Sequence, residues 1–307
     1  MITKIFYMRI AHLSDLHLCS YFKENNFLKL EKAILKGLEY GVQHFVFSGD
    51  ISDNANENEL KKFKDLLKKL KIYESEKSTV TIGNHDIFGG PQTASDVINF
   101  PSKCLKVNYN DKVLSFVDFF KELFENTITI DNSSNFPFLK IVNDNALIII
   151  NSIDEYSRFK NPFASNGKIR KDVREKISKL LNHEKAKDKL KISVIHHHFY
   201  HNNENVSSSE NNIWTKVENY TMKLRNKKKI LKLFKEHNVK IVLHGHSHEM
   251  KEYYRDGIHF FNSGGAFEGD AYKMFILNAF NFDISYELIK EQLLQTNYEI
   301  LASKIAM

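Results

Sequence analysis

Short apolar segments that are typical of buried strands alternate along the first third of the chain with segments that carry apolar residues at helical spacing. Strands are expected at 7–13, 45–47 and 79–82, and amphipathic helices at 27–38 and 60–70. Each successive pair of strands is therefore separated by a helix. Because parallel strands need such a crossover connection, this order predicts a parallel sheet that is covered by helices.

The rest of the chain continues the alternation less regularly. A long charged helix is expected at 169–189, and a helical segment ends near residue 237. Further strands are expected at 139–142, 147–151, 192–195, 240–243, 258–262 and 274–277, with a β-leaning stretch near 282–288. No internal repeat or flexible linker divides the sequence, so residues 1–307 are predicted to form a single domain.

Two stretches do not fit the alternation and are expected to cover the site. Residues 87–126 contain one helical stretch near 117–124 and are interpreted as a cap insertion over one face. Residues 200–222 are polar and are interpreted as a lid loop. Because binding groups collect on loops of this kind, substrate specificity is expected to reside in these two segments.

Composition narrows the choice of ligand and compartment. The 307 residues include 44 basic and 38 acidic side chains, which gives a net charge of +6 and favours anionic ligands. The two cysteines, Cys19 and Cys104, cannot form a disulfide framework or a cysteine zinc site, and a reducing, cytoplasmic location is therefore expected. No apolar run approaches the ~18 residues of a membrane span, so no membrane association is expected.

Five polar clusters stand at the ends of predicted strands. They are the segments 15–17, 49–53, 83–86, 196–198 and 245–248. Because the carboxyl ends of parallel strands meet at one edge of a sheet, the clusters are expected to converge in space. Together they supply two carboxylates, one amide oxygen and four imidazoles, namely Asp15, Asp50, Asn84, His17, His196, His246 and His248. This mixture of nitrogen and oxygen ligands is typical of divalent metal sites.

Each cluster also has an ordinary structural explanation. Asp50 and Asn84 both follow a glycine, as residues in turns and at helix N-caps often do. Three consecutive histidines, starting at His196, can be exposed residues without a role, or partly buried core residues. The spacing of His246 and His248 is the strongest single signal, because alternate residues at a strand end point to one side. The occurrence of all five clusters at strand ends favours the metal site over five separate coincidences.

The ordered set of motifs resembles the calcineurin-like metallophosphoesterase superfamily over residues 15–248. The motifs are Asp-x-His, Gly-Asp-x-x-Asp, Gly-Asn-His-Asp, His-His-His and Gly-His-x-His. The triple histidine is similar to that of the class III cyclic-nucleotide phosphodiesterase branch, although Phe199 stands where that branch has a proline. The resemblance implies an α/β fold in which a two-sheet β sandwich is flanked by helices.

The resemblance also implies a site with two divalent metal ions. The first ion would be held by Asp15, His17, Asp50 and His248, and the second by Asp50, Asn84, His196 and His246. Asp50 would bridge the ions, and His196 is preferred over His197 as the ligand of the triple histidine. The mixed ligands suit Mn, Fe, Zn, Ni or Co, with Mn or Fe favoured.

Other residues receive supporting roles from the same resemblance. His85 would face the substrate phosphate and the leaving oxygen as the catalytic group. Asp53, Asp86, His197 and His201 would support the ligands or line the substrate pocket. The implied reaction is hydrolysis of a phosphate ester by in-line attack of a hydroxide held between the ions.

Several functions remain open at this point. The leading one is a phosphodiesterase that acts on small molecules such as cyclic nucleotides. A nuclease of the repair-exonuclease branch is an alternative, but the lysine-rich run at 223–235 is interpreted as the solvated face of a helix and does not favour nucleic acid. A non-catalytic protein-binding scaffold of the same fold would tolerate lost ligands, and none is lost here. His246 and His248 also resemble part of the metallo-β-lactamase motif, but Glu249 follows them instead of the Asp-His pair. No oligomeric state is predicted.

Overall fold

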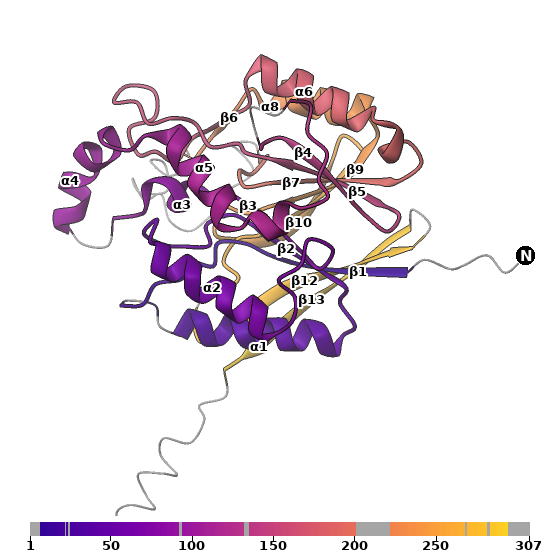
Figure 1. The fold of residues 1–307 in the computed structure, drawn as a ribbon, viewed down its shortest axis with the longest axis horizontal. Helices are drawn as coiled ribbons and strands as arrows, with labels where there is room; N and C mark the ends of the chain where they lie inside the picture. Colours follow the sequence, from indigo (N-terminus) through magenta and orange to yellow (C-terminus); the bar gives the residue numbers. More distant parts are fainter. Residues whose placement is uncertain are drawn as a thin grey trace, which may run out of the picture.

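The computed structural model describes residues 7–293 apart from 22, 24, 92–93, 132–134, 201–221, 268 and 281–282. Two large β-sheets lie face to face between two layers of helices (Figure 1). The first sheet has the strand order β13-β12-β1-β2-β3, and the second has the order β10-β11-β9-β7-β5-β4. The expected two-sheet α/β sandwich is therefore confirmed.

The strands of the two sheets have the following bounds. The first sheet contains β1 (Tyr7–Leu13), β2 (His44–Ser48), β3 (Ser78–Thr81), β12 (Ala271–Phe280) and β13 (Asp283–Gln292). The second sheet contains β4 (Phe138–Val142), β5 (Asn145–Ile150), β7 (Leu190–Ile195), β9 (Val239–His244), β10 (Met250–Arg255) and β11 (Ile258–Ser263). A short separate pair consists of β6 (Gly167–Lys168) and β8 (Leu224–Arg225).

The helices cover the two outer faces of the sandwich. Helices α1 (Asn25–Glu39) and α2 (Glu57–Lys69) lie on the first sheet, and α6 (Lys171–Leu181) and α8 (Lys227–Glu236) lie on the second (Figure 1). In α2, the ring of Phe63 packs edge-on against Phe47 of β2, with ring centroids 5.1 Å apart. The apolar face from which a helix at 60–70 was predicted is thus the face of α2 that packs against the sheet.

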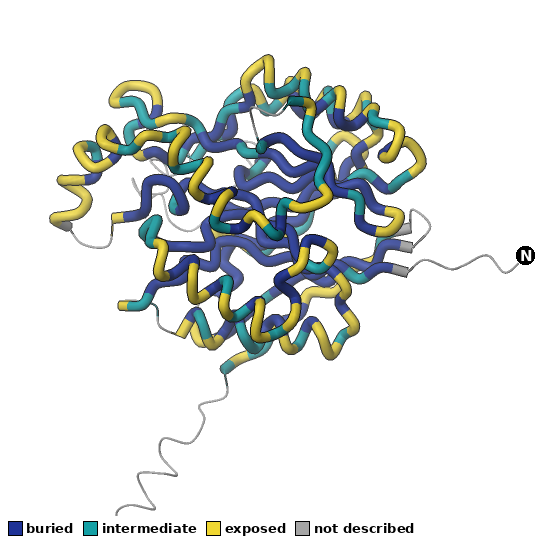
Figure 2. Tube along the Cα trace, viewed as in Figure 1, coloured by how far each residue is buried: buried dark blue, intermediate teal, exposed yellow. Residues whose placement is uncertain are grey.

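The central strands are parallel and end at the same level. Strand β2 pairs in parallel with both β1 and β3, and its register places Phe47 beside Leu13 and Val80. In the second sheet, β7 pairs in parallel with β5 and β9. These strands are dark blue in Figure 2 because both of their faces are covered, which explains why they appear in the sequence as continuous apolar runs. Their carboxyl ends bring the predicted polar clusters to one edge of the sandwich.

A buried lysine joins the two sheets away from that edge. Lys140 of β4 is 2% exposed, and its ammonium group donates to the carbonyls of Ser75, Ser78 and Leu123 at 3.0, 3.0 and 2.7 Å. His44, at the start of β2, is also fully buried. Its Nδ1 donates to the carbonyl of Glu76, and its Nε2 accepts from the hydroxyl of Thr79.

The insertion between β3 and β4 is more helical than predicted. Where the sequence predicted one helical stretch at 117–124, the structure has α3 (Asn84–Phe88), α4 (Ala94–Leu105), α5 (Tyr109–Phe119) and the 3-10 helix η1 (Lys121–Phe124). The amide oxygen of Asn108 accepts from the amide of Asp111 and so begins α5 earlier than expected. The role of residues 87–126 as a cap stays a prediction, as does the single domain.

The remaining expectations, on the 169–189 helix, the lid, the cysteines and the location, have different outcomes. The helix predicted at 169–189 is shorter, because α6 ends at Leu181 before Asn182, a weak helix former, and only a 3-10 turn, η2 (Glu184–Ala186), follows. Most of the lid predicted at 200–222 lies outside the described residues. Cys19 and Cys104 are free and buried, while the cytoplasmic location stays a prediction. Within the described ranges, no helix combines the length and hydrophobicity that a membrane crossing requires.

Candidate metal centre

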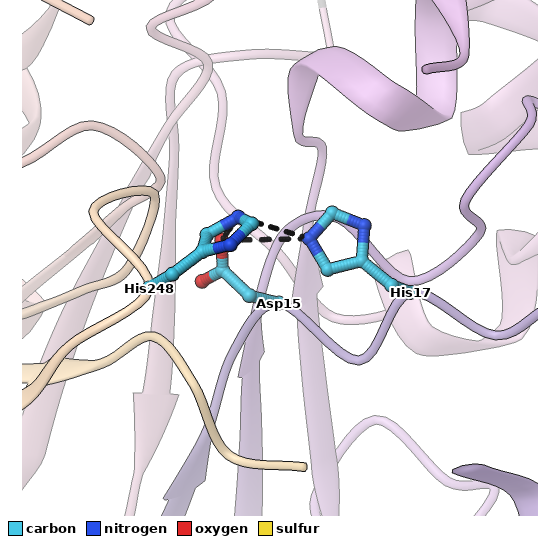
Figure 3. A group of neighbouring side chains, drawn as sticks. All are labelled: Asp15, His17 and His248. Carbon is cyan, nitrogen blue, oxygen red and sulfur yellow. Dashed lines mark hydrogen bonds and ion pairs between the residues drawn. The ribbon is translucent and has the colours of Figure 1, made fainter. Parts of the chain in front are cut away.

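Three side chains from opposite ends of the chain form the first candidate ion site. One ligand atom each of Asp15, His17 and His248 lies within 4.8 Å of the others, and Figure 3 shows these side chains facing one another. Nε2 of His248 lies 3.2 Å from Nε2 of His17 and 3.6 Å from Oδ1 of Asp15. The loops after β1 and β9 thus bring one carboxylate and two imidazoles together, as the motifs predicted.

A second group lies beside the first. Ligand atoms of Asp50, His196 and His246 also lie within 4.8 Å of one another. Nε2 of His196 is 3.3 Å from Oδ2 of Asp50 and 3.1 Å from Oδ1 of Asn84. Oδ2 of Asp50 is in turn 3.9 Å from Nε2 of His17. Asp50 therefore lies between the two groups, where a bridging carboxylate is expected.

The three consecutive histidines, 196–198, have different neighbours. His196 faces Asp50, whereas Nδ1 of His197 lies 2.7 Å from the hydroxyl of Ser152, away from the carboxylates. Nδ1 of His198 accepts from the amide of Tyr200. The geometry therefore favours His196 over His197 as the ligand. His201 lies outside the described residues.

The outer ring nitrogens of three candidate ligands have their own acceptors. Nδ1 of His17 lies 2.9 Å from Oδ1 of Asp53, and Nδ1 of His196 donates to the Ser48 carbonyl at 3.0 Å. Nε2 of His246 donates to a carbonyl as well, that of Ser165, at 2.9 Å. Such contacts fix the tautomer and the ring orientation of metal-binding histidines, so that the inner nitrogen is the one that can face a cation.

The backbone of most of the predicted ligands adopts the left-handed conformation, which residues other than glycine rarely adopt. Five of the seven predicted ligands have positive φ angles of 53°, 43°, 52°, 74° and 49°, namely Asp15, His17, Asp50, His246 and His248. A non-glycine residue in this region costs about 1 kcal/mol or more unless its surroundings hold it there. For two of them, backbone hydrogen bonds provide that support: the amide of Asp15 donates to the carbonyl of Gly49, and the amide of His17 donates to the carbonyl of Asp50.

Two glycines allow the loops to approach so closely. A Cβ atom at Gly83 would lie 2.1 Å from Oδ1 of Asp50, and one at Gly245 would lie 2.0 Å from Oδ2 of Asp15. Neither position can accept a side chain without displacing a carboxylate. The glycines of the Gly-Asn-His-Asp and Gly-His-x-His motifs are therefore needed for contact between the clusters.

His85 stands at the edge of the first group and is partly open to solvent. Its side chain is 22% exposed, its Nδ1 donates to the Asp53 carbonyl at 3.0 Å, and its ring lies edge-on to His17. The next residue, Asp86, is buried and accepts from the backbone amides of Ser52 and Gly83. Asp86 thus joins the loops that follow β2 and β3, while the roles predicted for Asp86 and His85 stay predictions.

Asp50 and His196 stabilise one another as charged groups. Burial by itself would raise the pKa of Asp50, but His196, His85 and His17 hold it well below the usual range. Burial would likewise lower the pKa of His196, but Asp50 outweighs it and raises the pKa to about 9. Asp50 is therefore ionised at neutral pH, and binding of a divalent cation would displace the ring proton of His196.

An open cavity of about 620 Å³ adjoins the first group. Asp15, His17 and His248 form part of its wall, and Lys23 and Lys29 also line it. The Lys23 ammonium lies 3.1 Å from Oδ1 of Asp53, the carboxylate that also contacts His17. Neither lysine could be recognised in the sequence, because neither belongs to a motif and their proximity to the site depends on the turn that follows His17.

The whole arrangement matches one family of enzymes. A family model described as calcineurin-like phosphoesterase matches residues 8–250. The chain belongs to this family. The predicted superfamily is thus confirmed, and membership supports a phosphoric ester hydrolase. A comparison with curated proteins found no match.

Two solved structures share the fold of this calcineurin-like phosphoesterase. A dimetal phosphatase from Danio rerio is 11% identical, with a TM-score of 0.53 over 91% of this chain and 98% of that one. The purple acid phosphatase PPD1 from yellow lupin (Lupinus luteus) seeds is 14% identical, with a TM-score of 0.56 over 93% of this chain. The match covers 52% of the lupin protein, so this chain spans about half its length.

The donor set fits the divalent ions of such a phosphoesterase. Each group of three combines a carboxylate with two imidazoles at mutual distances that a single cation can satisfy. Together with the family, the two groups indicate a dinuclear site. Asp53 and His85 form a third group with His17, but Nδ1 of His85 already donates to the Asp53 carbonyl and Nδ1 of His17 already contacts the Asp53 carboxylate, which favours a supporting arrangement over a third ion.

Proposed function

We propose that this chain is a phosphodiesterase that uses two divalent metal ions to hydrolyse small phosphate diesters, with cyclic nucleotides as the specific substrate class. The observation that carries the proposal is the position of Asp50. Its Oδ2 lies 3.3 Å from Nε2 of His196 and 3.9 Å from Nε2 of His17, so that one carboxylate adjoins both groups of ligands.

Each ion would have four protein ligands. The ligands of the first ion are Asp15, His17, Asp50 and His248, and those of the second are Asp50, Asn84, His196 and His246. Their mixture of imidazole, carboxylate and amide oxygen suits manganese or iron, and also zinc, nickel or cobalt. When bound, such a pair of ions lowers the pKa of a shared water and offsets the charge that develops on the phosphate oxygens.

The remaining side chains would orient and protonate the reacting groups. Because Nδ1 of His85 donates to the Asp53 carbonyl, its Nε2 is the ring nitrogen that can meet the substrate. As an imidazolium, His85 would donate a hydrogen bond to the phosphate and then a proton to the leaving oxygen. Asp53 would keep His17 and His85 in place, since it contacts both rings.

The cavity beside the first ion would hold the organic part of the substrate. Its volume of about 620 Å³ lies in the range of small-molecule sites. Tyr21 and Phe267 offer it aromatic surface, and Lys23 offers a positive charge. Aromatic rings and a cation suit a nucleotide, which combines a flat base with a negative phosphate. The similarity of the histidine triplet from His196 to that of the class III branch supports the same choice.

The decisive experiment is a substrate screen of the purified chain after loading with Mn²⁺. Phosphomonoesters, a chromogenic model diester, cyclic nucleotides and oligonucleotides would be compared at one enzyme concentration, with a chelated sample as the control. We expect hydrolysis of the model diester and of at least one cyclic nucleotide, and loss of both activities after chelation.

Other outcomes would change the assignment. Preference for single-stranded oligonucleotides with steep salt dependence would indicate a nuclease. Hydrolysis of monoesters alone would indicate a phosphatase. A chain that binds no Mn²⁺ and hydrolyses nothing would contradict the proposal and would favour a non-catalytic scaffold.

A further inference from the structure

The loop between β5 and β6 is closed at its base beside the second candidate ion site. Residues 152–166 leave the end of β5 and return to β6, where Ile153 and Gly167 form an antiparallel bridge. The amide of Lys168 also donates to the carbonyl of Ser152 at 2.8 Å. The two ends of this β5–β6 loop therefore lie side by side.

His197 connects the two ends of the β5–β6 loop through its side chain. Its Nδ1 lies 2.7 Å from the hydroxyl of Ser152 at the start of the loop, and its Nε2 lies 3.2 Å from the carbonyl oxygen of Ser165 near the end. A carbonyl only accepts hydrogen bonds, so Nε2 carries the proton and Nδ1 accepts from the serine. The ring of His197 is fully buried in this position.

The Ser165 carbonyl has a second donor, which is a candidate metal ligand. Nε2 of His246 donates to it at 2.9 Å, and the centroids of the His197 and His246 rings lie 4.3 Å apart. Nδ1 of His246, on the opposite side of its ring, lies 3.1 Å from Nε2 of His196. A single carbonyl oxygen therefore joins His197 to a residue of the ion site.

We propose that His197 is a positioning residue for the second ion. By tying both ends of the β5–β6 loop, it holds the Ser165 carbonyl where that oxygen fixes the tautomer and orientation of His246. The Nδ1 atom of His246 is thereby presented to the ion. The inference rests on the proposed function, because it assigns His246 to that ion, and it gives the second histidine of the triplet a role that differs from direct binding.

Gly167 provides separate support for a fixed position of the His197 ring. A Cβ atom at residue 167 would lie 2.6 Å from Cγ and 2.7 Å from Nδ1 of that ring. The imidazole therefore packs directly on the backbone of β6, where any side chain would force it to move. The ring is held on one side by this contact and at both nitrogens by hydrogen bonds.

The experiment compares two substitutions of His197 that each retain one of its two contacts. The amide nitrogen of a glutamine stands near the place of Nε2, so His197→Gln can still donate to the Ser165 carbonyl. The amide group of an asparagine stands near the place of Nδ1, so His197→Asn can contact Ser152 but cannot reach Ser165. Mn²⁺ binding to metal-free protein would be measured by calorimetry, and the thermal midpoint of each metal-free protein would be recorded.

We expect the wild-type chain to bind two Mn²⁺ ions. In His197→Asn, the affinity for one of them should fall by about 10–100-fold, the usual effect of losing a partner of a metal-binding histidine. In His197→Gln, it should stay within a few-fold of wild type. Ser193→Ala is the matched control, because Ser193 lies in β7, the strand that leads into His197, and its buried hydroxyl lacks a partner among the described residues. It should leave Mn²⁺ binding unchanged.

The results separate this inference from the proposed function. Two ions bound with unchanged affinity in His197→Asn would overturn the inference alone. Equal losses of affinity in the Asn and Gln variants, with equally lowered thermal midpoints, would also overturn it, because they would show that the ring only fills space. A wild-type chain that binds no Mn²⁺ would overturn the proposed function together with the inference.

Discussion

The carboxylate of Asp53 lies 2.9 Å from Nδ1 of His17, and this contact joins the second motif of the chain to the first. The same carboxylate oxygen is 3.6 Å from Nδ1 of His85 and 3.1 Å from the ammonium of Lys23. One buried group therefore orients a candidate ligand, a candidate catalytic group and a cation of the cavity wall.

This arrangement predicts a graded effect of substitutions at Asp53. Asp53→Asn keeps an oxygen that can accept from His17, whereas Asp53→Ala leaves the ring without its partner. We expect Mn²⁺ affinity at the first site to fall by about 10–100-fold in the alanine variant and by less in the asparagine variant. Calorimetric titration of metal-free protein measures both values. Equal affinities in wild type and Asp53→Ala would show that His17 needs no such partner.

Asp50→Asn should have the largest effect on the ions. The substitution removes the negative charge between the two groups while it preserves the size of the side chain. We expect hydrolysis to be abolished and at least one ion to bind more weakly, with fewer than two metal equivalents by elemental analysis after gel filtration. A variant that keeps full activity and two bound ions would contradict the bridging role.

His85→Ala should separate chemistry from metal binding. The His85 ring stands at the edge of the first group, so its removal should leave two ions in place but lower kcat by about 10²–10⁴-fold, the contribution of a general acid. The matching measurements are metal content and steady-state kinetics on a model diester. Loss of an ion in this variant would place His85 among the ligands.

Acid should destabilise the chain partly through His44. Burial, reinforced by the charge of Lys140, lowers the pKa of His44 to about 3 from an ordinary value of 6.5. The unfolded chain therefore binds more protons than the folded one between these pH values. Stability is highest above pH 6.5 and is lost progressively as the pH falls toward 3, at up to about 1.4 kcal/mol per pH unit from this group.

Replacement of His44 tests this dependence. His44→Gln should lower the free energy of unfolding at pH 7.5 by about 1–3 kcal/mol, because a contact with Glu76 or Thr79 is weakened. It should also make the decline in stability between pH 6.5 and 5 less steep. Part of the decline should remain, because burial also lowers the pKa of His12 to about 3. Urea unfolding of chelator-treated protein measures both effects. Parallel pH profiles for the two proteins would refute the assignment.

The sequence predicted the strands of the site because their burial on both faces leaves an unambiguous apolar pattern. It did not predict β10, none of whose residues is buried, or α4, which contains Pro101. That the strands form two sheets followed from the family resemblance and not from periodicity, because strand order depends on contacts between distant segments. The expected parallel neighbours, such as β1 and β2, were correct.

The candidate ligands could be predicted from the sequence, whereas the groups that hold those ligands in place could not. Asp15, Asn84 and His248 belong to motifs that combine a strand end with a metal-binding side chain. By contrast, the Ser165 carbonyl could not be predicted, since every residue has a carbonyl and only the path of the β5–β6 loop brings this one to His246. Lys23 escaped prediction in the same way, because its contact with Asp53 is set by a turn.

The left-handed backbone at five of the seven candidate ligands has a consequence for engineering. Asp15 and His17, for example, are held in this conformation by backbone hydrogen bonds to the loop that follows β2. A peptide that carried one of the motifs alone would relax to an ordinary turn and would no longer bind a cation. Transfer of this centre to another protein would therefore require both sheets and their connecting loops as one unit.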